Sequence, residues 1–371
     1  MKNGKDKILI IGGAGFIGSH LANELAQQGH AVRVLDVLDP QVHGEEGIFP
    51  RHLSQDVECV QGDVRNRDDV VRALRGVSCV YHLAAAVGVG QSMYQIAQYT
   101  EINNLGTAVL LECLIQHPVE RLVVASSMSV YGEGLYRDGD ALCEPSTRDV
   151  AQLSRGRWEL ERDGHLLLPA PTPETKTVTP ISVYALSKYD QERLCLIFGA
   201  TYDVPTVALR FFNVYGTHQS LSNPYTGVLA IFASRCLNGN PPLIFEDGAQ
   251  QRDFVSVHDI VHACALARTT NATGEVFNIG SGEPRSIASV ASDVIALTGA
   301  DVEAQITGKY RKGDIRHCYA DISKAQRLLG YQPKVRFSDG LAELAEWLSE
   351  ARAEDHFMRA DAELSERGLT L

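Results

Sequence analysis

The sequence lacks the patterns of a metal site, a disulfide framework or a membrane segment. Its 371 residues include eight cysteines but no CxxC pair, and twelve histidines without HExxH or another ligand spacing. We therefore expect free thiols in a reducing cytosol and no bound metal. No run of about 18 apolar residues occurs, and no N-terminal basic-then-apolar signal, which predicts a cytoplasmic protein with no membrane partner.

Positive charge is also scarce. The net charge of −12 disfavours nonspecific binding to nucleic acids or anionic membranes, so neither is an expected partner. An anionic substrate would need a few well-placed arginines. The hydrophobic fraction (44%) and charged fraction (22%) are those of a globular protein. A chain of this length can bury a large core and divide into two lobes.

The N-terminal segment has the pattern of a dinucleotide site. A buried strand, KILIIG, runs into GGAGFIGSH, in which Gly12, Gly15 and Gly18 are three residues apart; a helix and a second strand, AVRVLD, follow. The glycines let the backbone approach a pyrophosphate, and the helix N-terminus offers it free N–H groups. Asp36 ends the second strand, where its carboxylate accepts from ribose hydroxyls and repels a 2′-phosphate. Val37 supplies no arginine for that phosphate, so NAD is favoured over NADP.

Strands and helices continue to alternate as far as ERLVVASS. This order predicts an α/β fold, a doubly wound parallel (Rossmann) sheet with ligands at the carboxyl ends of its strands. Ala84, Ala85 and Ser127 fall at such ends. Small residues there allow a cofactor to lie flat against the backbone. Asp63 has the same position, and either contacts adenine or caps a helix N-terminus.

Tyr184 and Lys188 form a YxxxK pair. Residues four apart lie on the same face of a helix. The lysine charge favours the phenolate and is expected to lower the tyrosine pKa, which makes a phenol a usable base. Ser127, delivered from a strand end, then holds the reacting oxygen. The pair is weak evidence alone, and gains weight from the nucleotide pattern.

Several segments follow one another in the order found in a known family: GGAGFIGSH, Asp36, GDV, HLAA, SSMSVYG, YALSK and LRFFNVYG. Over roughly residues 7 to 340, apart from one insert, the chain resembles the extended short-chain dehydrogenase/reductases, in the branch of nucleotide-sugar epimerases and dehydratases. The resemblance implies tightly bound NAD, with Ser127, Tyr184 and Lys188 as the catalytic residues. The cofactor contacts that it implies are Gly12, Gly15, Phe16, Ile17, Gly18, Asp36, Asp63, Val64, Leu83, Ala84, Ala85, Asn103, Tyr184 and Lys188.

The second half contains candidate groups for a diphosphate. Arg252 and Arg311 supply planar forks that recognise phosphates, and the amide of Asn213 closes a strand where it could donate to one. A lone arginine is more often in a surface ion pair, but the resemblance matches both to residues that clamp the diphosphate and nucleoside. It also places Asp314 at the ribose, with Leu243 and Phe245 beside the base; Phe245 as core packing is the alternative. The substrate contacts that it implies are Ser127, Ser129, Asn213, Val228, Leu243, Phe245, Arg252, Arg311, Asp314 and Cys318.

The residues after Ser127 separate the reactions of this branch, which share a keto intermediate at sugar C4. Tyr184 would remove the O4 proton while hydride passes from C4 to NAD. The 4,6-dehydratases resembled here carry an Asp-Glu pair after the catalytic hydroxyl residue, and decarboxylating relatives a glutamate at position 129. This chain has Met128 and Ser129. Neither is an acid or a base, which leaves C4 epimerisation without net redox change.

Three alternatives stay open at this point. A nucleotide-sugar 4-ketoreductase or dehydrogenase would use the same residues with exchangeable cofactor. A 4,6-dehydratase would release a 4-keto-6-deoxy product. A nucleotide-binding sensor on an inactive scaffold commonly lacks the tyrosine or lysine, and this chain has both.

Two features bear on the substrate. Counted from Asp314, Cys318 matches a gate residue that is a bulky tyrosine in 4-epimerases restricted to plain hexoses, so a wider sugar range is expected, unless Cys318 only packs. The segment 133–179 is longer than the epimerase pattern needs; it is expected to be extended and to border the sugar, or to form a surface oligomer contact. Similar inserts in dTDP-L-rhamnose 4-epimerases make dTDP-L-rhamnose and dTDP-6-deoxy-L-talose the leading pair. A UDP-hexose or UDP-N-acetylhexosamine is the alternative substrate.

The expected organisation is two interleaved lobes. Residues 1–212 form the NAD-binding Rossmann domain, with the 133–179 insert near the active site. Residues 213–371 mainly form the smaller α/β nucleotide-sugar lobe, with about 253–282 returning to the first domain. The resemblance also implies a homodimer formed through helices near 95–117 and 183–200. The tail after residue 352 has no readable function.

Overall fold

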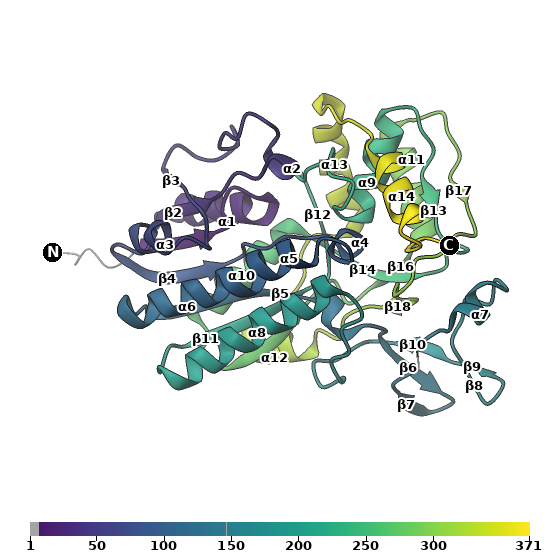
Figure 1. Cartoon of the computed structure of the whole chain (residues 1–371), viewed down its shortest axis with the longest axis horizontal. Coiled ribbons are helices and arrows are strands. Elements are labelled where there is room, and N and C mark those ends of the chain that lie inside the picture. The colour runs from purple at the N-terminus through teal and green to yellow at the C-terminus, as the bar shows by residue number, and fades with distance from the viewer. Residues whose placement is uncertain (1–6, 146) are drawn as a thin grey trace.

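A seven-stranded parallel sheet forms the centre of the molecule. The computed structural model describes residues 7–145 and 147–371, and the order of the sheet is β15-β11-β5-β4-β1-β2-β3 (Figure 1). The strands are β1 (Lys7–Ile11), β2 (Ala31–Asp36), β3 (Val57–Gln61), β4 (Val77–His82), β5 (Arg121–Ser127), β11 (Thr206–Phe211) and β15 (Glu275–Ile279). This confirms the predicted doubly wound fold. The strand order reverses between β1 and β4, and a ligand crevice is expected at their carboxyl ends.

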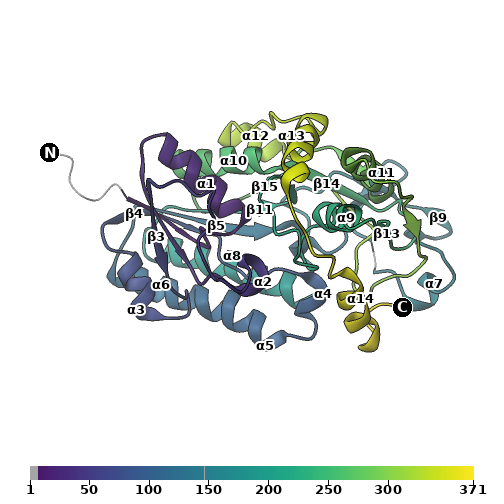
Figure 2. The same ribbon diagram turned by 90° about the horizontal axis from the view of Figure 1, so that it is seen from above.

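Helices cover both faces of the sheet (Figure 2). One face carries α1 (Phe16–Gln27), α10 (Val257–Thr269) and α12 (Ser323–Leu329), and the other carries α3 (Arg67–Ala73), α6 (Gly106–Gln116) and α8 (Val183–Thr201). Successive side chains of β1 enter different cores. Ile8 and Ile10 belong to one cluster, while Leu9 and Ile11 belong to the other. This alternation explains why the strand reads as a continuous apolar run.

Short helical segments surround the carboxyl ends of the strands. They are α2 (Pro40–His43), α4 (Val89–Ser92), α5 (Ile96–Tyr99), the π-helical turn η1 (Thr100–Leu105) and the 3₁₀ turn η2 (Met128–Tyr131). The helix predicted near residues 95–117 is therefore not a regular α-helix over its whole length. It passes through η1 before α6 begins. The π-turn places Asn103 in the interior, where its side chain is fully buried.

A smaller α/β half packs against one end of the sheet. It contains a sheet of β12 (Asn213–Tyr215), β14 (Gln251–Ser256) and β16 (Pro284–Ser286), with β18 (His317–Cys318) paired to β14, and a second sheet of β13 (Leu243–Ile244) and β17 (Gln305–Ile306). Its helices are α9 (Val228–Leu237), α11 (Ile287–Thr298), α13 (Phe337–Glu350) and α14 (Phe357–Glu366). Below, "substrate half" means residues 213–371 and "cofactor half" residues 7–212. This domain division stays a prediction, although β15 pairs with β11 in the large sheet.

The long insert forms its own small elements beside β18 (Figure 1). They are β6 (Leu135–Asp138), β7 (Ala141–Cys143), α7 (Val150–Leu153), β8 (Glu161–Arg162), β9 (His165–Leu166) and β10 (Leu168–Ala170). The proline-containing segment at β10 is extended, and it pairs with β6 in an antiparallel sheet. In the described part of the chain, no helix has the length and apolar character needed to cross a membrane.

Candidate active site

A cavity of about 940 Å³ opens at the carboxyl ends of the central strands. It extends from the glycine turn of the cofactor half to β12, α9 and α14 of the substrate half. The predicted site residues that line it are Gly12, Gly15, Phe16, Ile17, Gly18, Asp36, Asp63, Val64, Leu83, Ala84, Ala85, Ser127, Ser129, Tyr184, Lys188, Asn213, Val228, Arg311 and Asp314. The fold therefore brings most of them to one cavity.

The glycine turn has the shape that a dinucleotide pyrophosphate requires. Gly12 has φ +80°, and a Cβ there would lie 2.7 Å from the nitrogen of Ala84. A Cβ on Gly18 would lie 2.2 Å from the carbonyl oxygen of Gly12, so both positions must be glycine for the turn to close. Gly15 is different, because a Cβ there would meet only that same carbonyl, at 3.5 Å. Gly15 also begins α1 without a side-chain cap, which leaves the first N–H groups of the helix free for an anion.

Asp36 and Asp63, two predicted cofactor contacts, both line this cavity. The carboxylate of Asp36 accepts from the backbone nitrogens of Ala14 and Leu38, both at 3.0 Å. It thus joins the end of β2 to the glycine turn and keeps further lone pairs for ribose hydroxyls. Asp63 accepts from the backbone nitrogen and guanidinium of Arg65, and the cap of α3 is Asn66. The helix-cap explanation for Asp63 is therefore wrong, and its adenine contact stays a prediction.

The three predicted catalytic residues come from two elements. Ser127 ends β5, while Tyr184 and Lys188 lie in the first turns of α8, which Ser182 caps through the nitrogen of Ala185. A further bond from the backbone nitrogen of Tyr184 to the hydroxyl of Ser92 fixes the start of the helix, at 3.0 Å. All three residues line the cavity that lies between the cofactor half and the substrate half.

The hydroxyl of Ser129 completes this group. It donates to the Oγ of Ser127 at 2.8 Å, and the Ser129 backbone nitrogen also lies 3.2 Å from that oxygen. Because Ser127 accepts from Ser129, its own proton is free to be donated toward Tyr184 or a substrate oxygen. The arrangement is a chain of hydroxyl groups without a carboxylate.

Burial dominates the proton affinities of the two ionisable residues. It raises the pKa of Tyr184, and the hydroxyl of Ser127 acts against that increase. Burial also lowers the pKa of Lys188 to about 8. The expected lowering of the tyrosine pKa by Lys188 is therefore not seen in the protein alone. The physical reason is that both side chains lose hydration, and Lys188 instead gives a hydrogen bond to Gln191 at 2.6 Å.

Sequence reasoning missed Gln191, which orients Lys188. Its oxygen accepts from the Lys188 ammonium, and its amide nitrogen lies 2.9 Å from the hydroxyl of Thr107, 3.1 Å from His82 and 3.2 Å from the carbonyl of Ala84. The side chain is fully buried. A glutamine three residues after the lysine is the only sequence signal, and it gives no hint of these partners.

Asn103 does not line the cavity, although it was predicted to contact the cofactor. Its amide oxygen accepts from the nitrogen of Ala86 at 2.7 Å, and its nitrogen donates to Ala86 and to Ser187. It thus joins the loop after β4 to the catalytic helix. The contact between Asn103 and the cofactor stays a prediction.

On the substrate side, Asn213, Arg311 and Asp314 face the cavity. The guanidinium of Arg311 lies 4.4 Å from the ring centre of Phe245, and its Nε has no hydrogen-bond partner. The amide oxygen of Asn213 is also buried without a partner. These unpaired groups are available to a ligand, since buried polar atoms in native proteins are nearly always bonded.

Four other predicted substrate contacts do not reach the cavity wall: Leu243, Phe245, Arg252 and Cys318. Arg252 instead donates to the carbonyl oxygens of Gln251, Ile315 and Arg316, because β14 and β18 pair directly. Cys318 is 1% exposed, burial raises its pKa to about 12, and its thiol faces Thr172 of the insert. The proposed gate at Cys318 is therefore a buried packing position in this structure.

The insert acts on the site from outside the cavity. Within residues 133–145 and 147–179, no side chain lines it. Instead, Glu133 accepts from the backbone nitrogens of Arg316 and His317, and Glu159 pairs with both side chains. The fully buried Arg316 also pairs with Glu246. The insert thus fixes the strand that follows Asp314, a residue that lines the cavity.

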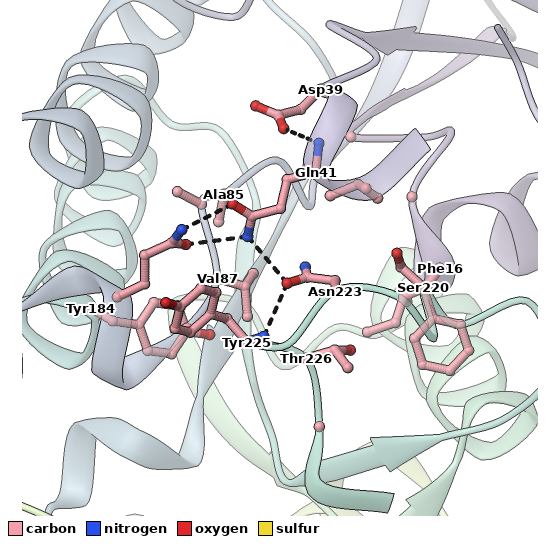
Figure 3. Close-up of a pocket in the computed structure, with 18 of the residues that line it drawn as sticks. Phe16, Asp39, Gln41, Ala85, Val87, Tyr184, Ser220, Asn223, Tyr225 and Thr226 are labelled. Carbon is pink, nitrogen blue, oxygen red and sulfur yellow. Dashed lines mark hydrogen bonds between the residues drawn. The ribbon is translucent and has the colours of Figure 1, made fainter. Parts of the chain in front are cut away.

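Figure 3 shows a second group of residues that sequence reasoning missed, which bridges the cavity. The amide of Gln41, from α2, donates to Gln91 at 3.2 Å and to Asn223 at 3.1 Å. Asn223 belongs to a loop of the substrate half and also accepts from the nitrogen of Tyr225. These contacts join the two halves across the opening. Amides scattered over loops have no spacing that would reveal the arrangement.

The Ser127→Ala variant is expected to shift the pH dependence of activity. In the wild type, kcat/KM should depend on the deprotonation of Tyr184, whose pKa burial raises, and on the charge of Lys188, whose pKa burial lowers to about 8. Loss of the Ser127 hydroxyl removes a donor that lowers the Tyr184 pKa, so the acidic limb should move to higher pH, and kcat should fall about 10²–10³-fold. Full pH–rate profiles of the wild type and of Ser127→Ala test this; an acidic limb that stays in place would contradict it.

Comparison with known proteins gives a consistent picture. The model of the "NAD dependent epimerase/dehydratase family" matches residues 8–150 and 166–280. A dTDP-L-rhamnose 4-epimerase of Burkholderia thailandensis is 35% identical over 351 residues, which cover 93% of this chain and 95% of that protein. The structure of a UDP-glucose 4-epimerase of Thermotoga maritima with UDP-glucose has a TM-score of 0.77 at 31% identity, over 93% of this chain and 99% of that one. A Thermus thermophilus UDP-glucose 4-epimerase in complex with NAD has a TM-score of 0.74 at 30% identity, with the same coverage.

Proposed function

The chain belongs to the NAD-dependent epimerase/dehydratase family, and we propose that it catalyses C4 epimerisation of a nucleotide-diphosphate sugar, with dTDP-L-rhamnose and dTDP-6-deoxy-L-talose as the leading pair. NAD is its cofactor, and the open face of Gly15, the free N-terminus of α1 and Asp36 fit it. When bound, NAD supplies an acceptor for the hydride of sugar C4 and returns it. The protein itself moves the proton and positions the sugar.

One observation carries the proposal. Tyr184 and Ser127 stand at the cavity wall between the two halves, and the two residues after Ser127 are Met128 and Ser129. The lining carboxylates are Asp36, Asp39, Asp63, Asp314 and Asp361. None of them adjoins Ser127 in the chain, so the acid–base pair needed for dehydration across C5 and C6 is not supplied there. The chemistry that these residues can still perform is the removal of the O4 proton and its return, which is what C4 epimerisation needs.

The proposed mechanism assigns the proton transfers to Ser127 and Tyr184. Ser127 donates to O4, and Tyr184 takes the O4 proton as the C4–H bond breaks, which leaves a transient 4-ketosugar. After the ketosugar turns over in the cavity, Tyr184 returns the proton to O4, while the cofactor would supply the hydride for the opposite face of C4. Lys188 is held by Gln191, and although burial lowers its pKa to about 8, it keeps most of its positive charge at neutral pH, one helical turn after Tyr184. The unpaired Nε of Arg311 and the amide nitrogen of Asn213 would donate to the diphosphate while the sugar rotates.

The identity of the relative supports the sugar assignment, and a substrate panel tests it. Purified protein without added NAD is incubated with UDP-, GDP-, CDP- and dTDP-linked sugars, and proton NMR reports the C4 configuration. We expect a mixture of C4 epimers from dTDP-L-rhamnose and no consumption of external NAD(P)H. Turnover of a UDP-hexose alone would replace the sugar assignment. Redox-coupled turnover without epimers would overturn the proposed reaction.

We also propose a homodimer. Its interface would be formed by the helical segments near residues 95–117 and 183–200, on the side that faces away from the sheet. Large apolar side chains are exposed there at Ile96, Leu105, Ile115, Leu186 and Ile197. Light scattering should give twice the chain mass of 40.5 kDa, and Ile197→Glu should give monomers. Leu166→Glu, on the exposed hairpin of the insert, should leave the dimer intact. A monomer from Leu166→Glu alone would place the interface on the insert instead.

A further inference from the structure

The C-terminal segment 355–371 packs at several fixed points against the rest of the substrate half and against the cofactor half; we call it the C-terminal wall. Asp355 pairs with the buried Arg235 at 3.1 Å, whose guanidinium lies 5.0 Å from the ring centre of Phe357. Further along, Glu363 accepts from the hydroxyl of Tyr94 at 2.9 Å. The last residues form a β-type pair with 310–312, through Tyr310 and Leu371 at 2.9 Å in both directions. Such repeated anchoring does not describe a free tail.

The C-terminal wall forms part of the cavity surface. Its lining residues are Phe357, Ala360, Asp361, Leu364 and Leu369. α14 lies beside α4 in Figure 2, and the absent Cβ of Gly90 would lie 3.2 Å from Leu364. The wall therefore spans from the substrate half to the loop after β4, across the cavity.

Asp361 has an unpaired oxygen in this surface. The residue is 6% exposed; its Oδ2 pairs with Lys309 at 3.0 Å, while its Oδ1 has no hydrogen-bond partner. Among the described residues, three cavity-lining residues have a buried side-chain atom without a hydrogen-bond partner: Asn213, Arg311 and Asp361. All three are in the substrate half. A buried carboxylate oxygen is costly to leave unbonded, which indicates that a ligand supplies the donor.

The position of Asp361 identifies the part of the substrate that meets it. The carbonyl oxygen of its partner Lys309 accepts a hydrogen bond from the backbone nitrogen of Glu246, the residue after Phe245. Arg311, which packs against Phe245, follows Lys309 by two residues. Phe357 also lies 6.5 Å, ring centre to ring centre, from Phe245. Arg311 lines the cavity and was predicted to clamp the diphosphate and nucleoside; Phe245, predicted to lie beside the base, packs against the Arg311 guanidinium without reaching the cavity wall. A carboxylate oxygen there can only accept, so its partner must be an N–H or an O–H.

We propose that Asp361 is a recognition residue for the nucleoside of the nucleotide sugar, with its Oδ1 accepting a hydrogen bond from a base N–H or a ribose hydroxyl. This inference rests on the proposed function, because it takes the substrate half to bind a nucleoside diphosphate. It gives the C-terminal wall a role in substrate binding.

Calorimetric titration of the NAD-loaded protein with UDP, dTDP and inorganic pyrophosphate tests the proposal. Asp361→Asn should weaken UDP or dTDP binding roughly 10- to 100-fold, because the amide oxygen turns to Lys309 and a donor faces the ligand. Pyrophosphate binding should not change. If Asp361→Asn weakens the binding of both UDP and dTDP, the donor is a base N–H or the 3′-hydroxyl that both nucleotides share. If it weakens the binding of UDP alone, the donor is the 2′-hydroxyl.

Matched variants separate recognition from structure. Lys309→Gln breaks the ion pair but leaves the Asp361 Oδ1 in place, so it should lower nucleotide affinity less than the Asp361 variants do. Glu366→Gln changes an exposed carboxylate of the same helix and should leave nucleotide affinity unchanged. Asp361→Ala should repeat the loss if Asp361→Asn folds poorly, as judged by bound NAD. The proposal is overturned if both Asp361 variants bind like the wild type, or if Lys309→Gln loses as much affinity as they do. Failure of the wild type to bind either nucleotide would refute the proposed function itself.

Discussion

Replacing Tyr184 with phenylalanine is expected to lower kcat about 10²–10⁴-fold while NAD stays bound. The reason is that the change removes only the hydroxyl that takes the O4 proton. The ring keeps its edge-on packing against Tyr99, at 6.4 Å between ring centres, and the backbone bond to Ser92 is unaffected. The rate of C4 epimer formation, measured at saturating nucleotide sugar, gives the result.

A matched control is available on the same helix. Tyr189→Phe removes a phenol that packs in a neighbouring apolar cluster, and it should change kcat by less than about threefold. Both variants should contain the same amount of NAD. An active Tyr184→Phe enzyme would show that another group removes the proton, and the proposed mechanism would then be wrong.

Glu192→Gln is expected to lower the free energy of unfolding by about 3–5 kcal/mol. Glu192 and Arg210 form a two-bond pair at 2.7 and 2.9 Å, with side chains only 1% and 5% exposed. Removal of the carboxylate charge leaves the guanidinium buried without a counterion. Urea unfolding followed by fluorescence measures the change.

Two further variants check the cause. Arg210→Met together with Glu192→Gln should cost less than the sum of the single changes, because no lone charge is left buried. Glu112→Gln breaks an exposed pair with Arg67 and should cost about 1 kcal/mol or less. Additive losses at 192 and 210 would contradict the explanation.

This pair also bears on catalysis. The hydroxyl of Ser126 donates to Glu192 at 2.6 Å, and Ser126 precedes Ser127 at the end of β5. The buried pair therefore joins the strand that carries Ser127 to the helix that carries Tyr184 and Lys188. A reduced kcat in Glu192→Gln, at temperatures where the variant is folded, is expected to accompany the lost stability.

The cofactor half could be predicted well from sequence because its signals are local. The glycine turn, the apolar run of β1 and Asp36 are close together in the chain, and one βαβ unit brings them together in space. The same holds for Tyr184 and Lys188, which one helical turn aligns. The strand β1 could be recognised because its side chains are buried on both faces of the sheet, which its apolar run records.

The substrate half was harder, because its contacts join segments far apart in the chain. The guanidinium of Arg252 is taken up by carbonyls near residue 315 only because β14 pairs with β18, and Cys318 is covered only because the insert packs over it. Neither event leaves a periodic pattern in the sequence. Asp361 is also invisible there, as one acidic residue in a charged tail.

The sequence by itself determined the α/β class, the dinucleotide turn and the serine, tyrosine and lysine to which we assign the chemistry, since each depends on spacings that local backbone geometry converts directly into position. Only the tertiary structure decided which polar groups face the cavity. That choice depends on which polar atoms other segments satisfy. It leaves Asn213, Arg311 and Asp361 with unpaired atoms at the cavity and takes Arg252 and Cys318 away from it.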